Sequence, residues 1–328
     1  MIQSRDVAAE MLSRIRRVTI ILNPEAGRGA ARHERENLES MFARAIRNLH
    51  DLVSWTVVET TGPGSATILA REAARNGVQI VVAAGGDGTI NEVVNGLVGT
   101  DVKLGIVPLG TGNDFARTIG CGLTIKEAVL SIFYGDPIRV DLGKLNDRYF
   151  INVAGCGFDS EVAHRVNSSN SRLRGRAAYI AAVYHSLKDF APVNMELTLD
   201  SERHEMNGML CAVANARHYG GGMMIAPEAL LNDGLFDVCV VCAGKWEFLK
   251  SFPRVFKGTH ISHPDVHILQ ASHVTVRTDR PVPVMLDGEI LGETPAEFSL
   301  VPEAISVLGP ERERDSTGEE FGYIAPKR

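Results

Sequence analysis

The sequence predicts an α/β protein of two domains: an N-terminal nucleotide-binding domain on a parallel sheet, and a C-terminal domain that is mainly an antiparallel β-sandwich. Up to residue 135, apolar β-branched runs alternate with helical patterns, as in a parallel sheet with covering helices. Residues 136–308 are a series of short strand-like runs. A length of 328 residues is ample for two cores. The charged tail 309–328 is expected either to complete the first domain or to stay unstructured.

Four strand–turn–helix units are predicted in the N-terminal domain. Their strands are the runs VTIIL, WTVVE, VQIVVAA and KLGIVPL, each followed by a glycine-containing turn. The turns fall at residues 23–29, 60–64, 85–88 and 110–114. In open α/β sheets, ligands bind beyond the carboxyl ends of the strands. We therefore expect the glycines and small hydroxyls of these turns to line one crevice.

The C-terminal domain is predicted from runs of strand length that are alternating or wholly apolar. In chain order they are RVDLGKL, RYFINVAG, MELTLD, GMLCAVANA, LFDVCVVC, HVTVRTD and PVPVMLDGEI. One helical stretch is expected at residues 175–190. Closely spaced short strands of this kind are typical of an antiparallel sandwich or barrel.

The segment GGDGTINEVVNG, residues 85–96, joins a buried strand to a helix. Thr89 and Glu92 have the T-x-x-E spacing of a helix capping box. Glycines at a helix N-terminus let an anion approach unpaired backbone N–H groups, so phosphate is the expected ligand. Asp87 would repel phosphate unless a cation lies between them, and Mg²⁺ commonly bridges carboxylates and phosphates. The pattern alone is equally consistent with a tight turn, since it matches neither the P-loop nor the Rossmann motif.

Composition argues against several other classes of protein. A net charge of −6 gives no support for nucleic-acid binding, and no apolar run approaches the length of a membrane span, so a cytoplasmic protein is expected. Five cysteines argue against a disulfide framework, and Cys239 and Cys242 should lie on opposite faces of one strand. His260, His263 and His267 could hold a metal by spacing, but without a fourth ligand nearby a solvated loop is expected.

Five motifs resemble those of the diacylglycerol kinase catalytic family, which includes bacterial soluble lipid kinases, sphingosine kinases and ceramide kinases. They are Asn23-Pro24 with Gly27, GGDGTINEVVNG, PLGTGNDFAR, YGGGMMIAPEALLNDGLFDV and LDGE, in the order and approximate spacing of the family. The similarity runs from about Val18 to Leu308. GGDGT alone is shared with NAD kinases and 6-phosphofructokinases, whereas the combination is specific. The resemblance implies an ATP-dependent lipid kinase, with diacylglycerol as acceptor and phosphatidic acid as product.

The resemblance also implies roles for individual residues. The ATP-binding positions would be Asn23, Pro24, Glu25, Ala26, Gly27, Thr60, Gly86, Asp87, Gly88, Thr89, Ile90, Asn91, Glu92 and Thr111. Asp87 and Asp114 would organise Mg²⁺ and water at the triphosphate, and Glu289 would be the catalytic base. A structural Mg²⁺ would be held around Leu230, Asp233 and Leu235, with a side-chain oxygen only from Asp233. Relatives often have serine at the position of Ala26, so phosphate contact there would rely on backbone N–H groups.

Several alternatives remain at this point. By spacing alone, Glu289 is better explained as an exposed hairpin acid, because D-G is a common two-residue turn, and the resemblance is what favours the base. The acceptor is equally open to phosphatidylglycerol or a sphingoid base. An NAD kinase-like phosphotransferase and a non-catalytic nucleotide- or lipid-binding protein are the two rival functions.

A membrane contact is predicted between Glu161 and Asp189. This stretch has no acidic residue and carries Arg172, Arg174 and Arg176 beside an amphipathic helical pattern. The alternative is a helix with its apolar face in the core and solvated arginines. With a lipid acceptor, the sequence predicts a cytoplasmic enzyme that binds the membrane peripherally during turnover, and a homodimer is a further expectation.

Overall fold

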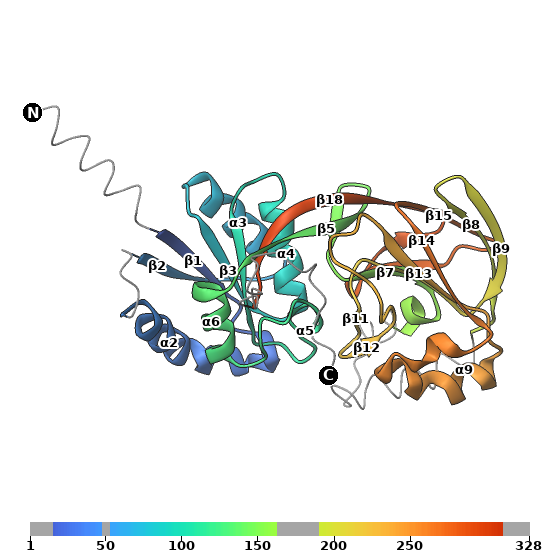
Figure 1. Cartoon of the computed structure of the whole chain (residues 1–328), viewed down its shortest axis with the longest axis horizontal. Coiled ribbons are helices and arrows are strands. Elements are labelled where there is room, and N and C mark those ends of the chain that lie inside the picture. Colours follow the sequence, from blue (N-terminus) through green and yellow to red (C-terminus); the bar gives the residue numbers. More distant parts are fainter. Residues whose placement is uncertain (1–15, 48–52, 163–189, 311–328) are drawn as a thin grey trace, which may run out of the picture. The chain divides into compact units, whose positions relative to one another are not determined.

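The computed structural model describes residues 16–47, 53–162 and 190–310 (Figure 1). It shows the mixed α/β architecture that the sequence predicts. The described residues divide into two compact units: the first comprises those up to Val140 and those from Ala304 to Pro310, and the second lies within Asp141–Glu303. The predicted boundaries after residues 135 and 308 lie a few residues away, because the strands β5 (Pro137–Leu145) and β18 (Ala296–Leu308) each continue across a boundary.

The first unit is built on four parallel strands in the order β2–β1–β3–β4. The bounds are β1 Arg16–Leu22, β2 Val53–Glu59, β3 Ile80–Gly85 and β4 Lys103–Pro108. The helices are η1 Ala26–Glu34 (a 3₁₀ segment), α2 Arg35–Arg47, α3 Ser65–Arg75, α4 Asp87–Leu97, α5 Asp114–Ile119 and α6 Ile125–Tyr134. This alternation confirms the four predicted units. The end of β18 adds a fifth parallel strand, pairing Ser306 with Lys103.

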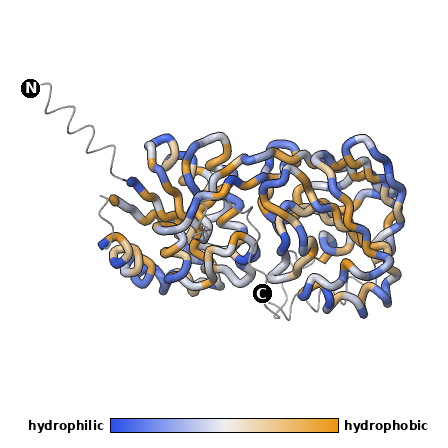
Figure 2. The backbone as a smooth tube through the Cα atoms, viewed as in Figure 1, coloured by the Kyte–Doolittle hydropathy of each residue, from blue (hydrophilic) through white to orange (hydrophobic). Residues whose placement is uncertain are grey.

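Helices cover both faces of this sheet, with α2 and α6 on one side and α3 and α4 on the other (Figure 1). All six residues of β3 are buried, which explains why the run shows no polar alternation. Ile80 and Val82 pack in one core cluster with Phe42 of α2 and Phe133 of α6, whose rings lie 5.3 Å apart. The backbone is hydrophobic along the inner strands and more hydrophilic at the outer turns (Figure 2).

The second unit contains two mainly antiparallel sheets. One has the order β18–β15–β8–β9, with β5 pairing β18 and β6, and the other has the order β14–β13–β10–β7–β16–β17. The bounds are β6 Arg148–Phe150, β7 Val153–Gly157, β8 Val193–Leu199, β9 Glu202–Gly208, β10 Leu210–Ala214, β13 Phe236–Val241, β14 Val266–Ala271, β15 His273–Thr278, β16 Pro283–Leu286 and β17 Glu289–Glu293. A short separate pair is β11 His218–Tyr219 with β12 Met223–Met224. All predicted strands are found, and β9, β14, β18 and the short pair β11–β12 are additional.

The strands β10 and β13 are buried at every position because their sheet is covered on both faces. One face meets the other sheet in a core that includes Val213 and Val238. The opposite face is covered by α9 (Lys245–Ser251), and by the 3₁₀ helices η2 (Phe252–Lys257) and η3 (Thr259–Ser262). Cys239 packs in the second core and Cys242 against the first, which confirms that the two thiols lie on opposite faces. All five cysteines are free.

A buried acid directly after β7 leads to a prediction on stability. Asp159 is 6% exposed, and burial raises its pKa from 3.8 to about 7. At a pH between these two pKa values, the carboxyl group is protonated in the folded protein and ionised in the unfolded chain. This group therefore makes the free energy of unfolding fall as pH rises, by a few kcal/mol in order of magnitude. Asp159→Asn is expected to flatten that dependence. Urea titrations of both proteins across the window measure it, and equal slopes would contradict the prediction.

Three sequence predictions lie outside the described residues. They are the helix at 175–190 (all but its last residue), the membrane segment with Arg172, Arg174 and Arg176, and the tail from residue 311. None of the helices within the described ranges has the length and apolar character needed to span a bilayer.

Candidate functional site

The four predicted turns lie together at the carboxyl edge of the parallel sheet in the first unit. Three backbone hydrogen bonds link the chain at these turns to the end of a neighbouring strand: Asn23 N to Ala84 O at 2.9 Å, Thr60 N to Leu22 O at 2.9 Å, and Leu109 N to Gly85 O at 2.8 Å. Because all four strands run in the same direction, the helix that follows each strand begins at this edge. This is the position where open α/β sheets bind ligands.

The first turn is fixed by Asn23. Its Nδ2 donates to Thr89 Oγ1 at 2.9 Å, and its Oδ1 accepts from Glu25 N at 3.0 Å. Gly27 has φ of +59°, and a Cβ there would lie 2.6 Å from Leu109 O. Glycine is therefore required at Gly27 both for its conformation and for close backbone packing.

The third and fourth turns meet backbone to backbone. A Cβ on Gly110 would lie 2.5 Å from the Cα of Gly86, so no side chain fits between them. Asn113, with φ of +56°, holds the fourth turn: its Oδ1 accepts from Gly110 N at 2.9 Å and its Nδ2 donates to Gly110 O at 3.1 Å. Two helix starts, those of α4 and α5, are thereby brought side by side. Their first N–H groups have no partner within the helix, a setting that favours an anion. At α5 the N–H of Phe115 already donates to the Asp87 carboxylate.

Two acids sit at these helix starts. Asp87 is the first residue of α4, and its Oδ1 accepts from Phe115 N at 3.1 Å, so it also caps α5. Burial raises the pKa of the Asp87 carboxyl, while the N–H groups of Phe115, Asp114 and Asn113 partly offset this. Asp114, the first residue of α5, is 4% exposed.

This pair of carboxylates fits the predicted Mg²⁺. A desolvated carboxylate is kept ionised by a nearby cation, and Mg²⁺ is usually held by one or two carboxylates together with substrate phosphates. Within the described ranges, no three His, Cys, Asp or Glu side chains are grouped as a metal site formed by protein alone would need.

The predicted capping box at Thr89 and Glu92 is wrong. The helix α4 begins two residues earlier, at Asp87 after the extended Gly86, so Thr89 is already helical and bonds Asn23. Glu92 instead caps the neighbouring helix α3: its carboxylate accepts from Gly64 N at 2.8 Å and Ala66 N at 3.0 Å. The sequence spacing could not show this, because the partner donors lie 26 and 28 residues away.

The predicted ATP-binding residues divide by accessibility. Glu25, Gly88 and Thr111 are exposed, and Thr60 and Asp87 are half-buried. The side chains of Thr89, Ile90 and Asn91 are buried in the framework, so a contribution to binding would come through the backbone or the position of the helix. The N–H of Ile90 already donates to Gly86 O at 3.1 Å.

A groove beside these turns was not predicted. It has a volume of about 530 Å³, within the usual range of ligand pockets, and runs from η1 and α2 past Leu109 and Gly110 to the start of α6. Its lining includes Asn37, Met41 and Lys126. These side chains lie in ordinary helical patterns, and only the fold brings them next to the glycine turns.

In the second unit, Glu289 follows a tight hairpin turn between β16 and β17. Asp287 and Gly288 both have positive φ, as the D-G hairpin hypothesis expects. The Asp287 carboxylate accepts from the N–H groups of three successive residues, 151 to 153, at 2.9, 2.9 and 3.0 Å. Glu289 is exposed, and its Oε2 lies 3.3 Å from Arg148 Nη2. The hairpin thus fixes the backbone of Glu289 and leaves its carboxylate exposed beside Arg148, whereas its catalytic role stays a prediction.

The predicted structural metal region contains several acids. Asp233 Oδ1 accepts from Leu235 N at 3.1 Å, and Leu230 is 36% exposed. Burial and then Asp233 raise the pKa of Asp237 to about 6. A cation would relieve this repulsion, but its other ligands would be carbonyls and water, and the site at Leu230, Asp233 and Leu235 stays a prediction.

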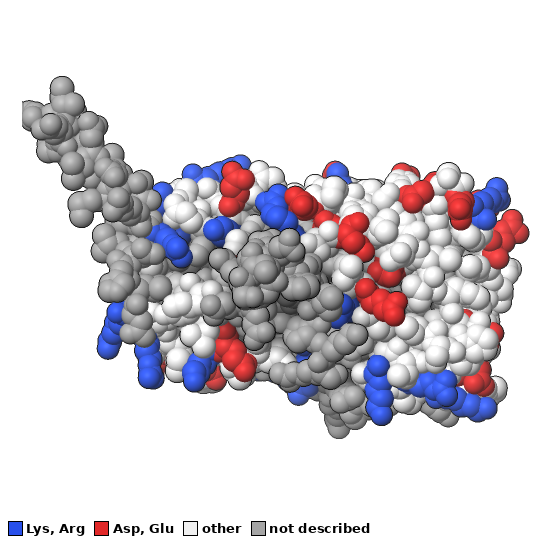
Figure 3. Space-filling model, in the orientation of Figure 1, with Lys and Arg blue, Asp and Glu red and all other residues white. Residues whose placement is uncertain are grey.

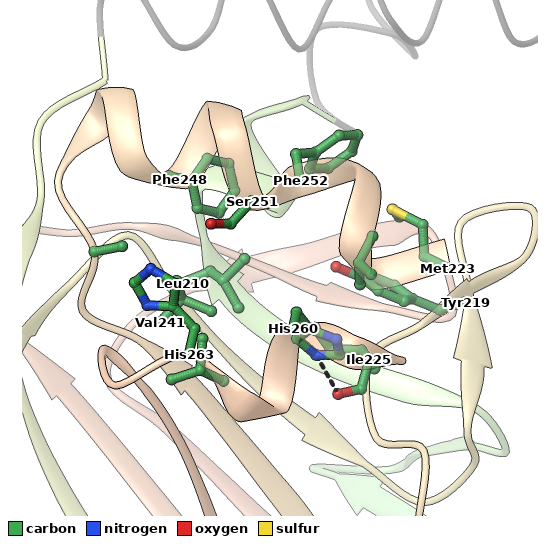
Figure 4. A pocket seen from close by; sticks show the side chains of 13 residues that line it. Leu210, Tyr219, Met223, Ile225, Val241, Phe248, Ser251, Phe252, His260 and His263 are labelled. Carbon is green, nitrogen blue, oxygen red and sulfur yellow. Dashed lines mark hydrogen bonds between the residues drawn. The ribbon is translucent and has the colours of Figure 1, made fainter. Parts of the chain in front are cut away.

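The second unit also has an apolar cavity of about 40 Å³ beneath α9 and η2, lined by Leu210, Met223, Phe248 and Phe252 among others (Figure 4). His260 lies at its lower edge and is 5% exposed, with its Nε2 3.0 Å from Ile225 O. The predicted solvated histidine loop is therefore wrong for His260. The 3₁₀ helix η3 turns this ring inward, a conformation that histidine spacing alone does not reveal.

Comparison with known proteins assigns both parts of the chain. Residues 17–145 match the diacylglycerol kinase catalytic domain, and residues 152–309 match the YegS C-terminal NAD kinase beta sandwich-like domain. A diacylglycerol kinase of Mycobacterium tuberculosis is 35% identical over 310 residues, covering 90% of this chain and 96% of that protein. One of Bacillus subtilis (strain 168) is 33% identical, covering 92% and 99%.

A solved structure agrees with this assignment. A protein of Bacillus anthracis (strain Sterne) proposed to be a diacylglycerol kinase superposes with a TM-score of 0.75 at 27% identity, covering 90% of this chain and 95% of that one. The two family matches, together with the fold, indicate a phosphotransferase with an α/β domain followed by a β-sandwich domain. The chain belongs to the diacylglycerol kinase family, a family of lipid kinases, and is a kinase.

Proposed function

We propose that this kinase transfers the γ-phosphoryl group of ATP to the hydroxyl of a membrane lipid, with diacylglycerol as acceptor and phosphatidic acid as product. The observation that carries the proposal is the backbone contact between Gly86 and Gly110, which brings two helix starts and two acids together at one edge of the sheet. Curated relatives named diacylglycerol kinase support the choice of acceptor.

In the proposed reaction, the acceptor oxygen forms a bond to the γ-phosphorus while the bond to the bridging oxygen breaks, releasing ADP. Phosphoryl transfer requires positioning and charge stabilisation more than covalent help. The turn N–H groups would bind phosphate oxygens, and Asp87 and Asp114 would hold Mg²⁺, which neutralises charge on the transferring group. Glu289 would accept the proton of the lipid hydroxyl.

A further feature supports this proposal. The groove of about 530 Å³ adjoins the fourth turn and is large enough for a nucleoside.

Incubation with γ-labelled ATP and a panel of acceptors tests the proposal. Diacylglycerol, phosphatidylglycerol and a sphingoid base are each presented in mixed micelles, and NAD is presented without lipid. Labelled phosphatidic acid is the expected product. Label on NAD alone would favour the NAD kinase-like alternative, and no labelled product with any acceptor would favour a binding protein.

Gly88→Ala is expected to weaken ATP binding by about tenfold or more, equivalent to about 1.4 kcal/mol, without loss of stability. A Cβ at Gly88 meets no protein atom within 4 Å, and alanine is the better helix former. A loss of ATP affinity would therefore indicate that the ligand lies close to the backbone at Gly88.

The control is Gly96→Ala in the same helix, where a Cβ would lie 2.6 Å from Thr67 O and should destabilise the fold instead. Calorimetric ATP binding and urea unfolding separate the two patterns, and normal ATP affinity in Gly88→Ala would exclude phosphate from this turn.

A further inference from the structure

The helical cover of the second unit is firmly anchored on its inner side. Phe248 of α9 packs on Phe158 with ring centroids 5.1 Å apart, and the rings of Phe248, Phe252 and Phe256 follow one another at 6.1 and 6.0 Å. Val255 of η2 is buried in the same core. The outer side of this cover is therefore held in a fixed orientation.

That outer side combines an aromatic ring with cations. Trp246 is 76% exposed, the highest value for a large apolar side chain among the described residues. Lys250, Arg254 and Lys257 are also exposed: Lys250 lies one turn after Trp246 on α9, and Arg254 and Lys257 lie one 3₁₀ turn apart on η2. We call these four residues the α9 surface. Lys and Arg side chains gather over α9 at the lower right of Figure 3.

We propose that the α9 surface binds the headgroup region of an anionic lipid bilayer. Tryptophan prefers the interface between water and acyl chains, where its ring is buried and its N–H stays solvated. Lysine and arginine beside it are attracted to anionic lipid phosphates. This inference rests on the proposed function only in that a membrane lipid is the acceptor.

Charge complementarity favours a membrane over other partners. The whole chain carries −6, so an anionic bilayer repels most of the protein. Residues 245–257 carry four cations and one acid, Glu247, which lies 3.8 Å from Lys250 Nζ and 3.3 Å from His263 Nε2. The carboxylate of Asp265 lies 4.0 Å from Nδ1 of the same imidazole. The local positive charge would therefore set which side of the second unit meets the membrane.

Tryptophan fluorescence can locate the contact directly, because the chain has only two tryptophans. The other, Trp55, is half-buried against Phe42 and is replaced in a Trp55→Phe background. We expect Trp246 emission to shift to the blue, and to be quenched by acyl-chain bromine, on vesicles of equimolar phosphatidylcholine and phosphatidylglycerol. Pure phosphatidylcholine should have little effect, and salt should reverse the response.

A second experiment tests the cations of the α9 surface by charge reversal. Lys250→Glu, Arg254→Glu and Lys257→Glu together should weaken vesicle binding by about 100-fold, since each lost cation alone accounts for about fivefold. The matched control reverses three exposed arginines of the first unit, Arg44, Arg47 and Arg75, with the same change in net charge. Control binding should fall much less.

Several results would overturn the proposal. One is a vesicle-bound protein whose Trp246 is not quenched. Another is equal binding by the α9 and control variants, or loss of binding only on Arg172→Glu, Arg174→Glu and Arg176→Glu, which would assign the contact to the segment predicted from sequence. A blue shift without lipid that grows with protein concentration would assign the surface to a second copy of the chain.

Turnover separates this inference from the proposed function. The α9 variant should lose activity on vesicle-borne diacylglycerol and keep it on a water-soluble short-chain diacylglycerol. If the native protein phosphorylates neither lipid but its Trp246 is still quenched, the proposed acceptor is wrong and the membrane surface stands.

Discussion

Asp87→Asn is expected to lower kcat by about 100-fold or more while the fold stays intact. Asparagine keeps the oxygen that accepts from Phe115 N, so the bond that joins α4 to α5 persists. What disappears is the negative charge that would hold Mg²⁺ at the triphosphate, and loss of one such electrostatic contact typically costs on the order of 100-fold in rate. Steady-state turnover at saturating Mg²⁺ and ATP measures this, and thermal unfolding confirms the fold.

A second substitution separates the two roles of this carboxylate. Asp87→Ala removes both the charge and the cap, so it should also lower stability by about 0.5–2 kcal/mol, which Asp87→Asn should not. Asp114→Asn should resemble Asp87→Asn in rate, because Asp114 is the buried acid at the neighbouring helix start. Near-normal turnover of Asp87→Asn would mean that Asp87 is only a helix cap.

The parallel sheet could be predicted because its signal is local. Each of its strands is a short apolar run followed by glycine and a helical pattern, and β3 is apolar throughout because helices bury both of its faces. The same reasoning placed the glycine turns at one edge, since parallel strands end on the same side. The predictions that depended only on the direction of single strands, namely the parallel sheet and the common edge of its turns, were correct.

The missed strands have signals that are weak in isolation. β9, with the sequence ERHEMNG, is exposed at alternate positions as the last strand of its sheet, and its polar residues mask the pattern. β18 contains Pro302 and Glu303, the latter with φ of +46°, yet it continues through them. Its pairing with β15 and β4 depends on segments distant in sequence, which a local window does not contain.

Side-chain partners were the least predictable part of the candidate site. Glu92 has a capping-box spacing, but its carboxylate accepts hydrogen bonds from the start of α3. Asn23 was expected at the nucleotide, and its side chain also donates a hydrogen bond to Thr89. Asp287 was expected only as a turn residue, whereas its carboxylate accepts from three successive N–H groups. Each partner is supplied by a different loop, so residue type and spacing predicted where the site lies but not how it is held.

For Glu289, the local sequence pattern and the family resemblance predict different roles. The hairpin hypothesis is correct for the backbone, since Leu286 pairs with Glu289 across the D-G turn. An acid in such a turn needs no catalytic explanation. Its exposure is nevertheless compatible with a catalytic base, which must come within hydrogen-bond reach of the acceptor hydroxyl. The two explanations differ in what they predict for an isosteric substitution.

Glu289→Gln is expected to lower kcat by roughly 10² to 10⁴ with ATP affinity nearly unchanged, because glutamine keeps the shape but cannot accept the proton of the lipid hydroxyl. The contact with Arg148 is exposed, so its loss should change stability by less than about 1 kcal/mol.

Glu293→Gln, at the other exposed end of the same strand β17, is the matched control and should leave kcat unchanged. Initial rates with saturating lipid, together with ATP binding by calorimetry, distinguish the outcomes. If Glu289→Gln weakens ATP binding and spares kcat, Glu289 belongs to nucleotide binding; if it resembles Glu293→Gln in both, the acid is a hairpin residue and the proton leaves by another group.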